Sequence, residues 1–405
     1  MHPNSSTTGI PDGEAGSWPL FRTRVLDWLV HETRTERFLD RILVEMCRRI
    51  ANSGIPLTRA SMHFRLLHPQ WMGARMVWRT GLDEAEIDTF DFGIETTPQY
   101  LKSPAHDIYC GTDEIRSKLT DTGSGKQYPL YDDLRKDGLI EYLAWPLEHT
   151  FGKRHVVTFA TDAKSGFGEE HVSFLKDLVP ILSLVTEIRA KNILSRTMLE
   201  TYVGPHASEQ ILAGATRRGS GTTVSAAIMI CDIRDFTALS DLWPRDEVIG
   251  LLNTYFDAMC EPIEARGGEI LKFMGDGLLA VFPLSNPDAC GNLLAAIREG
   301  RAAMDAFNSI NEERGLPVLR YGVGVHVGDI MYGNIGSRKR LDFTAIGPAV
   351  NVASRLESLT KKVKRPVLIS GAFAATAGTS AEFEDLGPFP LRGLGQPVDV
   401  LALLP

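Results

Sequence analysis

The fold is decided by the stretch VSAAIMICD, residues 224–232, a continuous apolar run that ends in a carboxylate. Such a run predicts a strand that is buried on both faces of a sheet. Asp232, at its C-terminal end, is poorly suited to a core and well placed to face a cleft. The turn that follows contains Phe236 and Thr237, and exposed backbone N–H groups in such a turn can hold phosphate oxygens beside a metal-bound Asp232.

A second aspartate, Asp276, lies at the tip of the hairpin predicted by EILKFMGDGLLAVFP, residues 269–283. Alone, Asp-Gly is an ordinary turn pair. Here only one helix, predicted over 245–265 by its apolar face, separates the hairpin from Asp232. A strand, helix and hairpin in this order can bring the two carboxylates together. Paired oxygen ligands suit Mg²⁺ or Mn²⁺ carrying a polyphosphate.

The segments that follow predict a fold of the α+β class. A helix near 287–314 and the strand LRYGVGVHVG, residues 319–328, would complete a β-α-β-β-α-β core of the ferredoxin-like or palm type. The glycines of this strand are out of step with a dinucleotide fingerprint and instead predict close approach of another backbone. The next helix, 349–359, places Asn351 and Arg355 on one face, where they can hold a ribose oxygen and developing phosphoryl charge.

Residues 224–405 resemble the catalytic domain of class III nucleotide cyclases. The segment YVGPHASEQIL, residues 202–212, likewise resembles the stretch that precedes such domains in bacterial members and couples sensor to output. Four segments, in this order and spacing, carry the resemblance of the catalytic domain: ICDIRDFTALS (230–240), LKFMGDGLLAVF (271–282), FTAIGPAVNVASRLE (343–357) and PFPLRGLGQPV (388–398).

This resemblance implies a metal site and a purine pocket. It makes Asp232 and Asp276 the ligands of two Mg²⁺ or Mn²⁺ ions, with the Ile233 carbonyl assisting, and it places Lys272 and Thr344 at the purine. A lysine donates a hydrogen bond to N1 of adenine, whereas N1 of guanine carries a hydrogen and prefers an acceptor side chain. The implied substrate is therefore ATP.

The remaining assignments from the resemblance concern the sugar and the phosphates. Asn351 and Arg355 match the ribose-orienting and transition-state residues. Arg392 falls where many members place a triphosphate-binding lysine, and Phe236 and Thr237 belong to the substrate-binding turn. The implied reaction converts ATP to 3′,5′-cyclic AMP and pyrophosphate. In this family the metal aspartates and the Lys/Asn/Arg set come from opposite subunits, so a chain that carries both implies a homodimer with two equivalent sites.

Two alternatives remain open at this point. The chain could be a catalytically inactive, cyclase-like regulatory or binding protein, or a guanylate cyclase. A diguanylate cyclase on the related palm-like fold would require a GGDEF-type hairpin, whereas this hairpin reads MGDGL.

Residues 20–190 predict a separate α+β domain. Apolar residues at helical spacing over 20–50 are followed by strand-like runs and by a closing helix over 166–188. This order resembles GAF-type sensor domains, whose last helix leads into an output domain, and it implies regulation by a small-molecule ligand of unknown identity. A flexible tail is expected at 1–19 and a helical connector at 191–223.

The composition excludes several classes of protein. With 405 residues, 43% of them hydrophobic, and a net charge of −8, a soluble protein of two or three domains is expected, and broad binding of nucleic acid is not. No apolar run reaches the ~20 residues of a membrane span and no secretory signal begins the chain, so a cytoplasmic location is expected. The five cysteines have no paired spacing, which favours buried thiols over disulfides or zinc. His106 and Cys110 are interpreted as a loop polar group and a small buried thiol.

Overall fold

The chain forms two compact units, Met1–Met198 and Leu199–Pro405, each with its own sheet. The tail predicted at 1–19 lies almost wholly outside the residues that the structure describes. Within those residues, no helix has both the length and the apolarity to cross a bilayer. The computed structural model describes the whole chain except residues 1–17, 67, 122, 124, 379–381 and 405.

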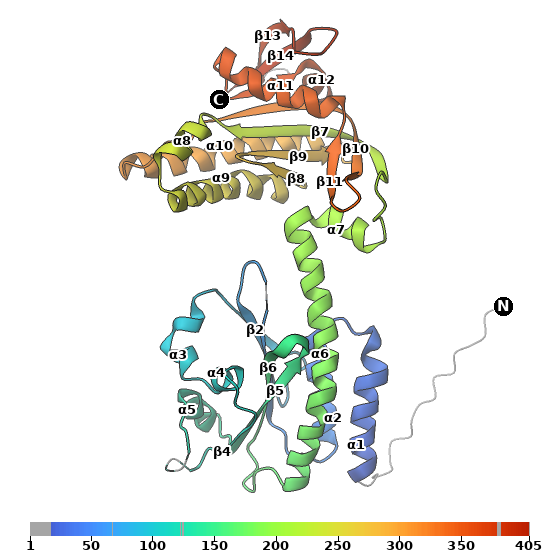
Figure 1. Ribbon diagram of the computed structural model, residues 1–405, viewed down its shortest axis with the longest axis vertical. Coiled ribbons are helices and arrows are strands. Elements are labelled where there is room, and N and C mark those ends of the chain that lie inside the picture. The colour runs from blue at the N-terminus through green and yellow to red at the C-terminus, as the bar shows by residue number, and fades with distance from the viewer. Residues whose placement is uncertain (1–17, 67, 122, 124, 379–381, 405) are drawn as a thin grey trace, which may run out of the picture. The chain divides into compact units, whose positions relative to one another are not determined.

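The C-terminal unit is an α+β domain built on an eight-stranded sheet (Figure 1). Seven strands follow the order β13-β14-β12-β10-β7-β9-β8, and β11 pairs with β10. In chain order the elements are α7 (Pro205–Leu212), β7 (Gly221–Ile233), α8 (Phe236–Leu242), α9 (Arg245–Ala265), β8 (Glu269–Met274), β9 (Gly277–Pro283), α10 (Ala289–Glu313), β10 (Tyr321–Gly336), β11 (Leu341–Ile346), α11 (Pro348–Val363), β12 (Val367–Ser370), α12 (Gly371–Ala377), β13 (Phe383–Phe389) and β14 (Val398–Leu403).

The centre of this sheet is the β-α-β-β-α-β core predicted from the sequence. Strands β10, β7, β9 and β8 lie side by side and are all antiparallel. Met229 and Cys231 of β7 pack with α9 and α10 on one face, whereas Ile228 and Ile230 belong to a second cluster on the other face. Strand β7 is therefore buried on both faces, and Asp232 lies at its end.

Helix α11 lies directly against the glycines of β10. A Cβ at Gly324 would lie 2.1 Å from the carbonyl oxygen of Ala353, and one at Gly328 would lie 2.7 Å from the Cβ of Ala349. Both separations are far inside van der Waals contact, so only glycine lets the helix and the strand approach this closely. The predicted close approach is confirmed, and it fixes which face of α11 lies against the sheet.

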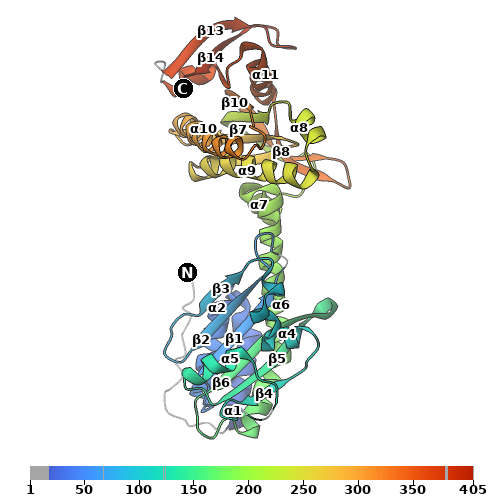
Figure 2. The ribbon, with the colours of Figure 1, turned by 90° about the vertical axis from the view of Figure 1, so that its left-hand side faces the viewer.

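The N-terminal unit is an antiparallel sheet of six strands in the order β3-β2-β1-β6-β5-β4. Figure 1 shows α3, α4 and α5 on one side of these strands and α2 and α6 on the other, and Figure 2 shows the sheet from a second side. The elements are α1 (Trp18–Asp27), α2 (Leu39–Asn52), β1 (Arg59–Arg65), β2 (Gly73–Arg79), β3 (Glu86–Phe90), α3 (Pro98–Leu101), α4 (Pro104–Tyr109), β4 (Ile115–Lys118), α5 (Pro129–Lys136), β5 (Glu141–His149), β6 (Lys153–Thr161) and α6 (Glu169–Val203).

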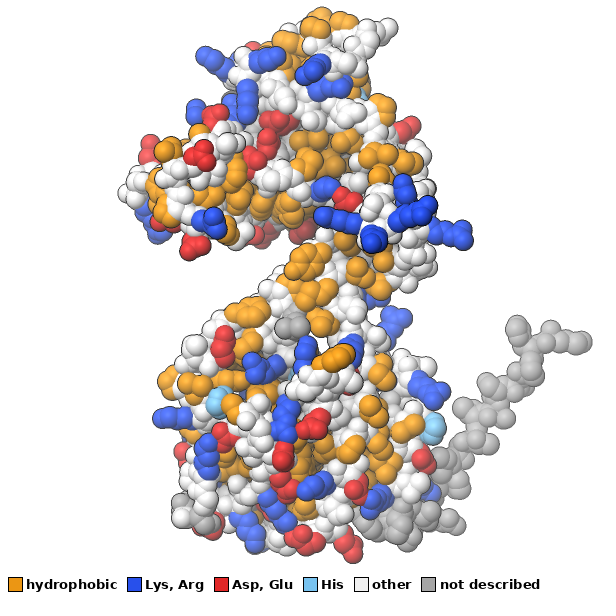
Figure 3. Space-filling view, viewed as in Figure 1, with side chains coloured by type: hydrophobic (Ala, Val, Ile, Leu, Met, Phe, Trp, Pro, Cys, Tyr) orange, Lys and Arg blue, Asp and Glu red, His pale blue; other side chains and the backbone are white. Residues whose placement is uncertain are grey.

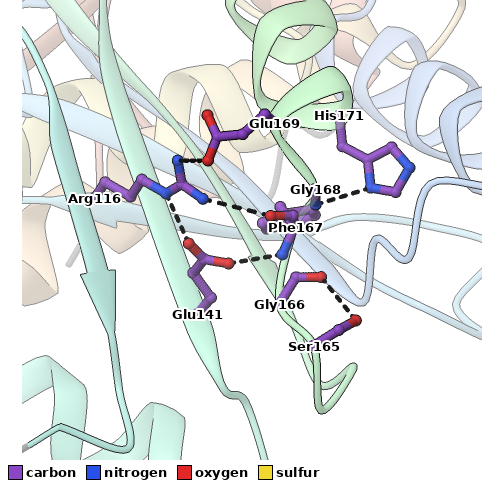
Figure 4. A network of polar contacts seen from close by, with 8 residues as sticks. All are labelled: Arg116, Glu141, Ser165, Gly166, Phe167, Gly168, Glu169 and His171. Carbon is purple, nitrogen blue, oxygen red and sulfur yellow. Dashed lines mark hydrogen bonds and ion pairs between the residues drawn. The ribbon is translucent and has the colours of Figure 1, made fainter.

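The start of α6 is tied to the sheet through a buried carboxylate (Figure 4). Glu141 Oε1 accepts a hydrogen bond from Arg116 Nε at 2.8 Å, and Oε2 accepts one from the Phe167 backbone N–H at 2.7 Å. Arg116 also pairs with Glu169, in the first turn of the helix, at 2.9 Å. Glu141 is only 1% exposed, so its charge is compensated where it lies.

Sequence patterns missed two strands of this unit and shortened one helix. Strands β3 and β4 have almost no buried side chains, so they lack the apolar signal that the other four strands carry. Helix α6 continues to Val203 and ends before Gly204, whose φ of +85° and ψ of 159° lie outside the helical region and suit glycine.

Two cysteines differ from the expectation of buried thiols, because Cys260 is only partly buried and Cys110 is exposed. Cys110 is exposed because it follows the last turn of α4, and its Sγ lies 3.5 Å from His106 Nε2. All five cysteines are free, and Cys47, Cys231 and Cys290 are buried.

Candidate active site

Asp232 and Asp276 lie together at one edge of the C-terminal sheet. Asp232 pairs in register with Gly277, the residue after Asp276. A Cβ at Gly277 would lie 2.8 Å from Asp232 Oδ1, so the hairpin closes directly over this carboxylate. The two carboxyl groups are close enough for the charge of one to raise the pKa of the other, Asp232. The structure thus brings the two aspartates together, as the order of strand, helix and hairpin predicts.

Acidic side chains make this corner electronegative. Burial and the neighbouring Asp276 raise the pKa of Asp232 to about 6. Glu357 of α11 is only 6% exposed, and burial together with Asp232 raises its pKa to about 7. Its Oε1 has no hydrogen-bond partner within the described part of the chain. A cation bound here would relieve the repulsion among the carboxylates.

The donor set fits a divalent metal that arrives with phosphates. The two carboxylates and the neighbouring Ile233 carbonyl are hard oxygen donors of the kind that Mg²⁺ and Mn²⁺ take. Across the described residues, no group of three or more His, Cys, Asp or Glu side chains could hold a metal by itself. Mg²⁺ is commonly bound by one or two carboxylates plus substrate phosphates, and this corner permits that arrangement.

A β-bulge determines which way Lys272 faces. Ile270 pairs with Ala280 and Lys272 pairs with Leu279, so Leu271 is an extra residue on β8. Beyond a bulge, the alternation of side chains between the two faces is shifted by one residue. Without it, Lys272 would point toward α9.

The bulge places Lys272 on the same face of the sheet as Asp232. Its partner Leu279 belongs to the hydrophobic cluster on that face. The next residue, Phe273, lies on the opposite face, where its ring centroid is 4.5 Å from that of Phe256 of α9.

An acidic residue of β11 holds Lys272. The Nζ of Lys272 donates a hydrogen bond to the Asp342 carboxylate, and both side chains are partly open to solvent. Thr344 lies two residues further along β11 and therefore on the same face as Asp342. Lys272 and Thr344, expected at the purine, thus lie on neighbouring segments, with Asp342 beside them.

Asn351 and Arg355 lie on the side of α11 that points away from the sheet. Ala349, Ala353 and Glu357 meet the glycines of β10, and Asn351 and Arg355 fall about half a turn from these residues. Asn351 is exposed and Arg355 is partly exposed. Both side chains are therefore available to a ligand.

The segment that carries Arg392 lies beside Arg355. A Cβ at Gly393 would lie 3.4 Å from Arg355 Nη2. Leu391 is buried in the cluster that includes Leu356 of α11, while Arg392 itself is exposed. The two arginines expected at the phosphates therefore come from adjacent segments.

Two sets of predicted residues stay apart within one chain. The sheet-facing side of α11 carries Glu357 next to Asp232, whereas Asn351 and Arg355 lie on its other side. Among the residues that the structure describes, no hydrogen bond or ion pair joins the aspartates to this second set.

In the turn after β7, the two predicted substrate-binding residues, Phe236 and Thr237, differ in exposure. Phe236 packs against the core beneath the sheet, while Thr237 is exposed in the first turn of α8. Asp235, just before the helix, has left-handed backbone at φ +59°.

Residues 220–401, which include all of these positions, match the family described as the adenylate and guanylate cyclase catalytic domain. The C-terminal unit carries a domain of this family. Its core, its paired aspartates and its helix with Asn351 and Arg355 together make up the cyclase domain of this protein.

Curated relatives of the cyclase domain include two named as adenylate cyclases. Adenylate cyclase 1 of Rhizobium meliloti (strain 1021) is 36% identical over 178 residues, which are 42% of this chain and 26% of that protein. The adenylate cyclase of Anabaena cylindrica is 37% identical over 174 residues, which are 42% of this chain and 33% of that protein. This chain thus spans only about a quarter to a third of the length of these relatives.

Solved structures similar to the cyclase domain include that of the guanylyl cyclase Cya2. It is 31% identical, with a TM-score of 0.41, and the match covers 45% of this chain and 93% of that one. The family assignment rests on the sequence match of residues 220–401.

Two residues of the cyclase domain were not identified from the sequence. Glu357 follows Ala349 and Ala353 at spacings of four, which puts an acid on the buried face of α11, and that pattern could have revealed it. Asp342 gives no such signal, because its partner Lys272 lies 70 residues away in the chain.

Proposed function

We propose that this protein is an adenylate cyclase, which converts ATP to 3′,5′-cyclic AMP and pyrophosphate at sites formed between two copies of its cyclase domain. The observation that carries the proposal is the meeting of Asp232, at the end of β7, with Asp276 of the hairpin, where the pKa of Asp232 is raised, in a domain of the cyclase family. The N-terminal unit would regulate this activity.

The aspartates are proposed to hold the metals. Asp232, Asp276 and the Ile233 carbonyl would bind two Mg²⁺ or Mn²⁺ ions. When bound, such ions lower the pKa of the ribose 3′-hydroxyl and offset the negative charge of the polyphosphate. The pKa of about 6 for Asp232 means that this carboxylate is mostly ionised at pH 7, which is the form that a metal requires.

The purine is proposed to lie against Lys272 and Thr344. The lysine would donate to N1 of adenine, and the threonine hydroxyl would accept from the exocyclic amino group. The Asp342 carboxylate, which accepts a hydrogen bond from Lys272, would limit the rotamers of the lysine. This pairing favours ATP over GTP.

The phosphates are proposed to meet the two arginines. As the 3′-oxygen attacks the α-phosphorus and the bond to the β-phosphate breaks, negative charge gathers on the phosphoryl oxygens. Arg355 and Arg392 would neutralise that charge, and Asn351 would hold the ribose oxygen. Removing one such contact typically slows a reaction by about 10²–10³-fold.

A homodimer would complete each site. Within one chain, Asn351 and Arg355 lie on the side of α11 opposite the aspartates, so a second copy must supply one of the two sets. Hydrophobic side chains are also exposed on this unit (Figure 3), among them Met274, Met331 and Ile346, each 43–44% exposed. Their burial against a second copy would favour association.

The reaction is tested by incubating the purified full chain with ATP or GTP and either Mn²⁺ or Mg²⁺. We expect cyclic AMP and pyrophosphate in equal amounts and slower turnover of GTP. Failure to form either cyclic nucleotide would support the inactive, binding-protein alternative, and faster turnover of GTP would make the protein a guanylate cyclase.

The shared site is tested by mixing two inactive variants. Asp232→Asn and Arg355→Ala should each be inactive alone. Because a mixed dimer keeps one intact site, subunit exchange should restore about a quarter of the wild-type activity. A site built within one chain predicts no recovery. Mixing Asp232→Asn with Asp276→Asn is the matched control, since both changes affect the same half-site.

A further inference from the structure

The N-terminal unit contains a cavity of about 460 Å³. It opens between the ends of β1 and β2, the segment 94–105 that contains α3, and the first turn of α5. This volume lies within the range of small-molecule binding sites. All of the described residues that line it belong to the N-terminal unit, so it is separate from the proposed active site.

Basic side chains gather on the sheet side of the cavity. His63 of β1 pairs in register with Arg75 of β2, and Arg65 pairs with Gly73, so His63, Arg65 and Arg75 share one face. Arg75 is neutralised by Asp88, at 2.7 Å. For Arg65, the described residues provide no acidic partner.

The other charged groups of the lining leave it net positive. Lys102 is exposed and has no acidic partner within the described chain. The acid that lines the cavity, Asp133, already pairs with Lys136 at 3.0 Å. Two cations, Arg65 and Lys102, are thus free to meet a ligand, and an anion is the ligand that they favour.

A buried arginine on the same face strengthens this field. Arg59 of β1 is only 6% exposed, and its Nε has no hydrogen-bond partner within the described chain. Burial and the like charges of Arg79 and Arg75 lower the pKa of Arg59 to about 10. Arg59 is not among the described residues that line the cavity, but its charge lies on the same face of β1 and favours an anion over a cation there.

Rings and neutral polar groups form the rest of the wall. The guanidinium carbon of Arg65 lies 5.2 Å from the ring centroid of Tyr109, and Tyr100 also lines the cavity. Burial and the nearby arginines lower the pKa of His63 to about 3, so its ring is neutral. Ser61 Oγ lies 2.9 Å from its Nε2, which leaves Nδ1 for another partner. Aromatic walls of this kind suit a flat ring.

We propose that this cavity binds a small organic anion that carries a flat ring, with its acidic group at Arg65 and Lys102 and its ring beside Tyr100 and Tyr109. Both an aromatic carboxylate and a nucleoside monophosphate have this chemistry. A cation would meet Arg65 and Lys102 unfavourably, and a neutral ring would leave both without a counter-charge.

The proposal is tested by calorimetric titration of the full chain with two matched pairs of probes, 2-naphthoate against 2-naphthamide and AMP against adenosine. We expect at least one anion to bind about tenfold or more tightly than its neutral counterpart. Equal affinity of both anions and their neutral counterparts, or no binding of any probe, would overturn the proposal.

Variants locate the bound anion. Arg65→Gln should weaken binding about tenfold and Lys102→Gln about threefold, because each removes one charged contact. Arg37→Gln, an exposed arginine with no ion pair to another described residue, should leave it unchanged. AMP can also enter the proposed active site, so Lys272→Glu separates the two sites. Loss of AMP binding in Lys272→Glu combined with full retention in Arg65→Gln would count against the cavity.

Discussion

Buried or half-buried carboxylates of the two units have opposite surroundings. In the N-terminal unit, Glu187 accepts hydrogen bonds from Lys191 Nζ at 2.6 Å and from the Thr150 backbone N–H at 3.0 Å, and these contacts lower its pKa to about 2. In the cyclase domain, burial and mutual repulsion raise the pKa of Asp232 to about 6 and that of Glu357 to about 7.

The difference distinguishes a carboxylate that stabilises the folded state from one that a bound cation would stabilise. A carboxylate with satisfied hydrogen bonds is most stable when ionised, so ionisation strengthens the folded state. A carboxylate crowded by other acids lowers stability when it ionises, and a bound cation removes that cost. Comparing matched substitutions in the two units therefore tests both roles.

The largest expected effect is on catalysis. Asp232→Asn should lower cyclase activity about a thousandfold or more, because it removes a charged metal ligand. The same variant should be at least as stable as the wild type in the absence of metal, since it removes repulsion with Asp276. Turnover assays and chemical denaturation measure the two effects. Asp241→Asn, an exposed aspartate of α8, is the control, and a destabilised Asp232→Asn would contradict the comparison.

In the N-terminal unit, removing a buried carboxylate should weaken the fold. Glu187→Gln is expected to lower the free energy of unfolding by about 1–3 kcal/mol at pH 7, because hydrogen bonds to a charged group are lost. The folded pKa lies below the usual value of 4.5, so this contribution is present above about pH 4.5 and disappears as the pH falls toward 2.

Urea unfolding followed by tryptophan fluorescence measures this change, because every tryptophan except Trp243 lies in the N-terminal unit. Glu84→Gln, an exposed glutamate, should have no effect. A loss of stability in Glu187→Gln that persists unchanged near pH 2 would argue against an electrostatic cause.

In the cyclase domain, the corresponding change should have the opposite sign. Glu357→Gln is expected to raise stability at pH 8 by about 1 kcal/mol in metal-free protein. The folded pKa, about 7, lies above the usual value of 4.5. The folded wild type therefore binds more protons than the unfolded chain, and its stability falls as the pH rises between these two values.

Hydrogen exchange of peptides from α11 and β10, measured from pH 5 to pH 8, reports the stability of the structure around Glu357. Protection should fall with pH in the wild type and in the control Glu313→Gln, after correction for intrinsic exchange rates, and should fall less in Glu357→Gln. Identical pH profiles for all three proteins would show that ionisation of Glu357 does not lower the stability of the folded domain.

The smallest expected effect concerns an exposed ion pair. Asp342→Asn should raise the KM for ATP about threefold with little change in kcat, because exposed pairs contribute less than about 1 kcal/mol. It should also narrow the preference for ATP over GTP, since Lys272 would lose the acceptor that holds it. A KM for Asp342→Asn equal to that of the control Asp241→Asn would show that Asp342 takes no part in purine recognition.

The sequence predicted the core of the cyclase domain because burial leaves a strong pattern. Strand β7 is apolar on both faces, and the hairpin with Asp276 is bounded by glycines, so the order of elements and the meeting of the aspartates followed from local signals. The role assigned to each site residue came from the family resemblance and stays a prediction until variants are measured.

Other features could not be predicted, because they depend on pairing between distant segments. The bulge at Leu271 leaves no mark in β8 itself, and the contact between Lys272 and Asp342 depends on β11 lying near β8. In the N-terminal unit, the strands β3 and β4 are too polar to show the apolar alternation by which a strand is recognised in a sequence. The GAF-like resemblance of this unit stays a prediction.

The bulge in β8 lets two neighbouring residues of one strand serve the same face of the sheet. Leu271, only 7% exposed, fills the hydrophobic cluster on that face, and Lys272 pairs with Leu279 on the same face. Deleting Leu271 would restore one-to-one pairing with β9 but would leave Lys272 opposite Leu279. Such a deletion should therefore lower the stability of the cyclase domain through lost apolar burial, while the lysine keeps its side of the strand.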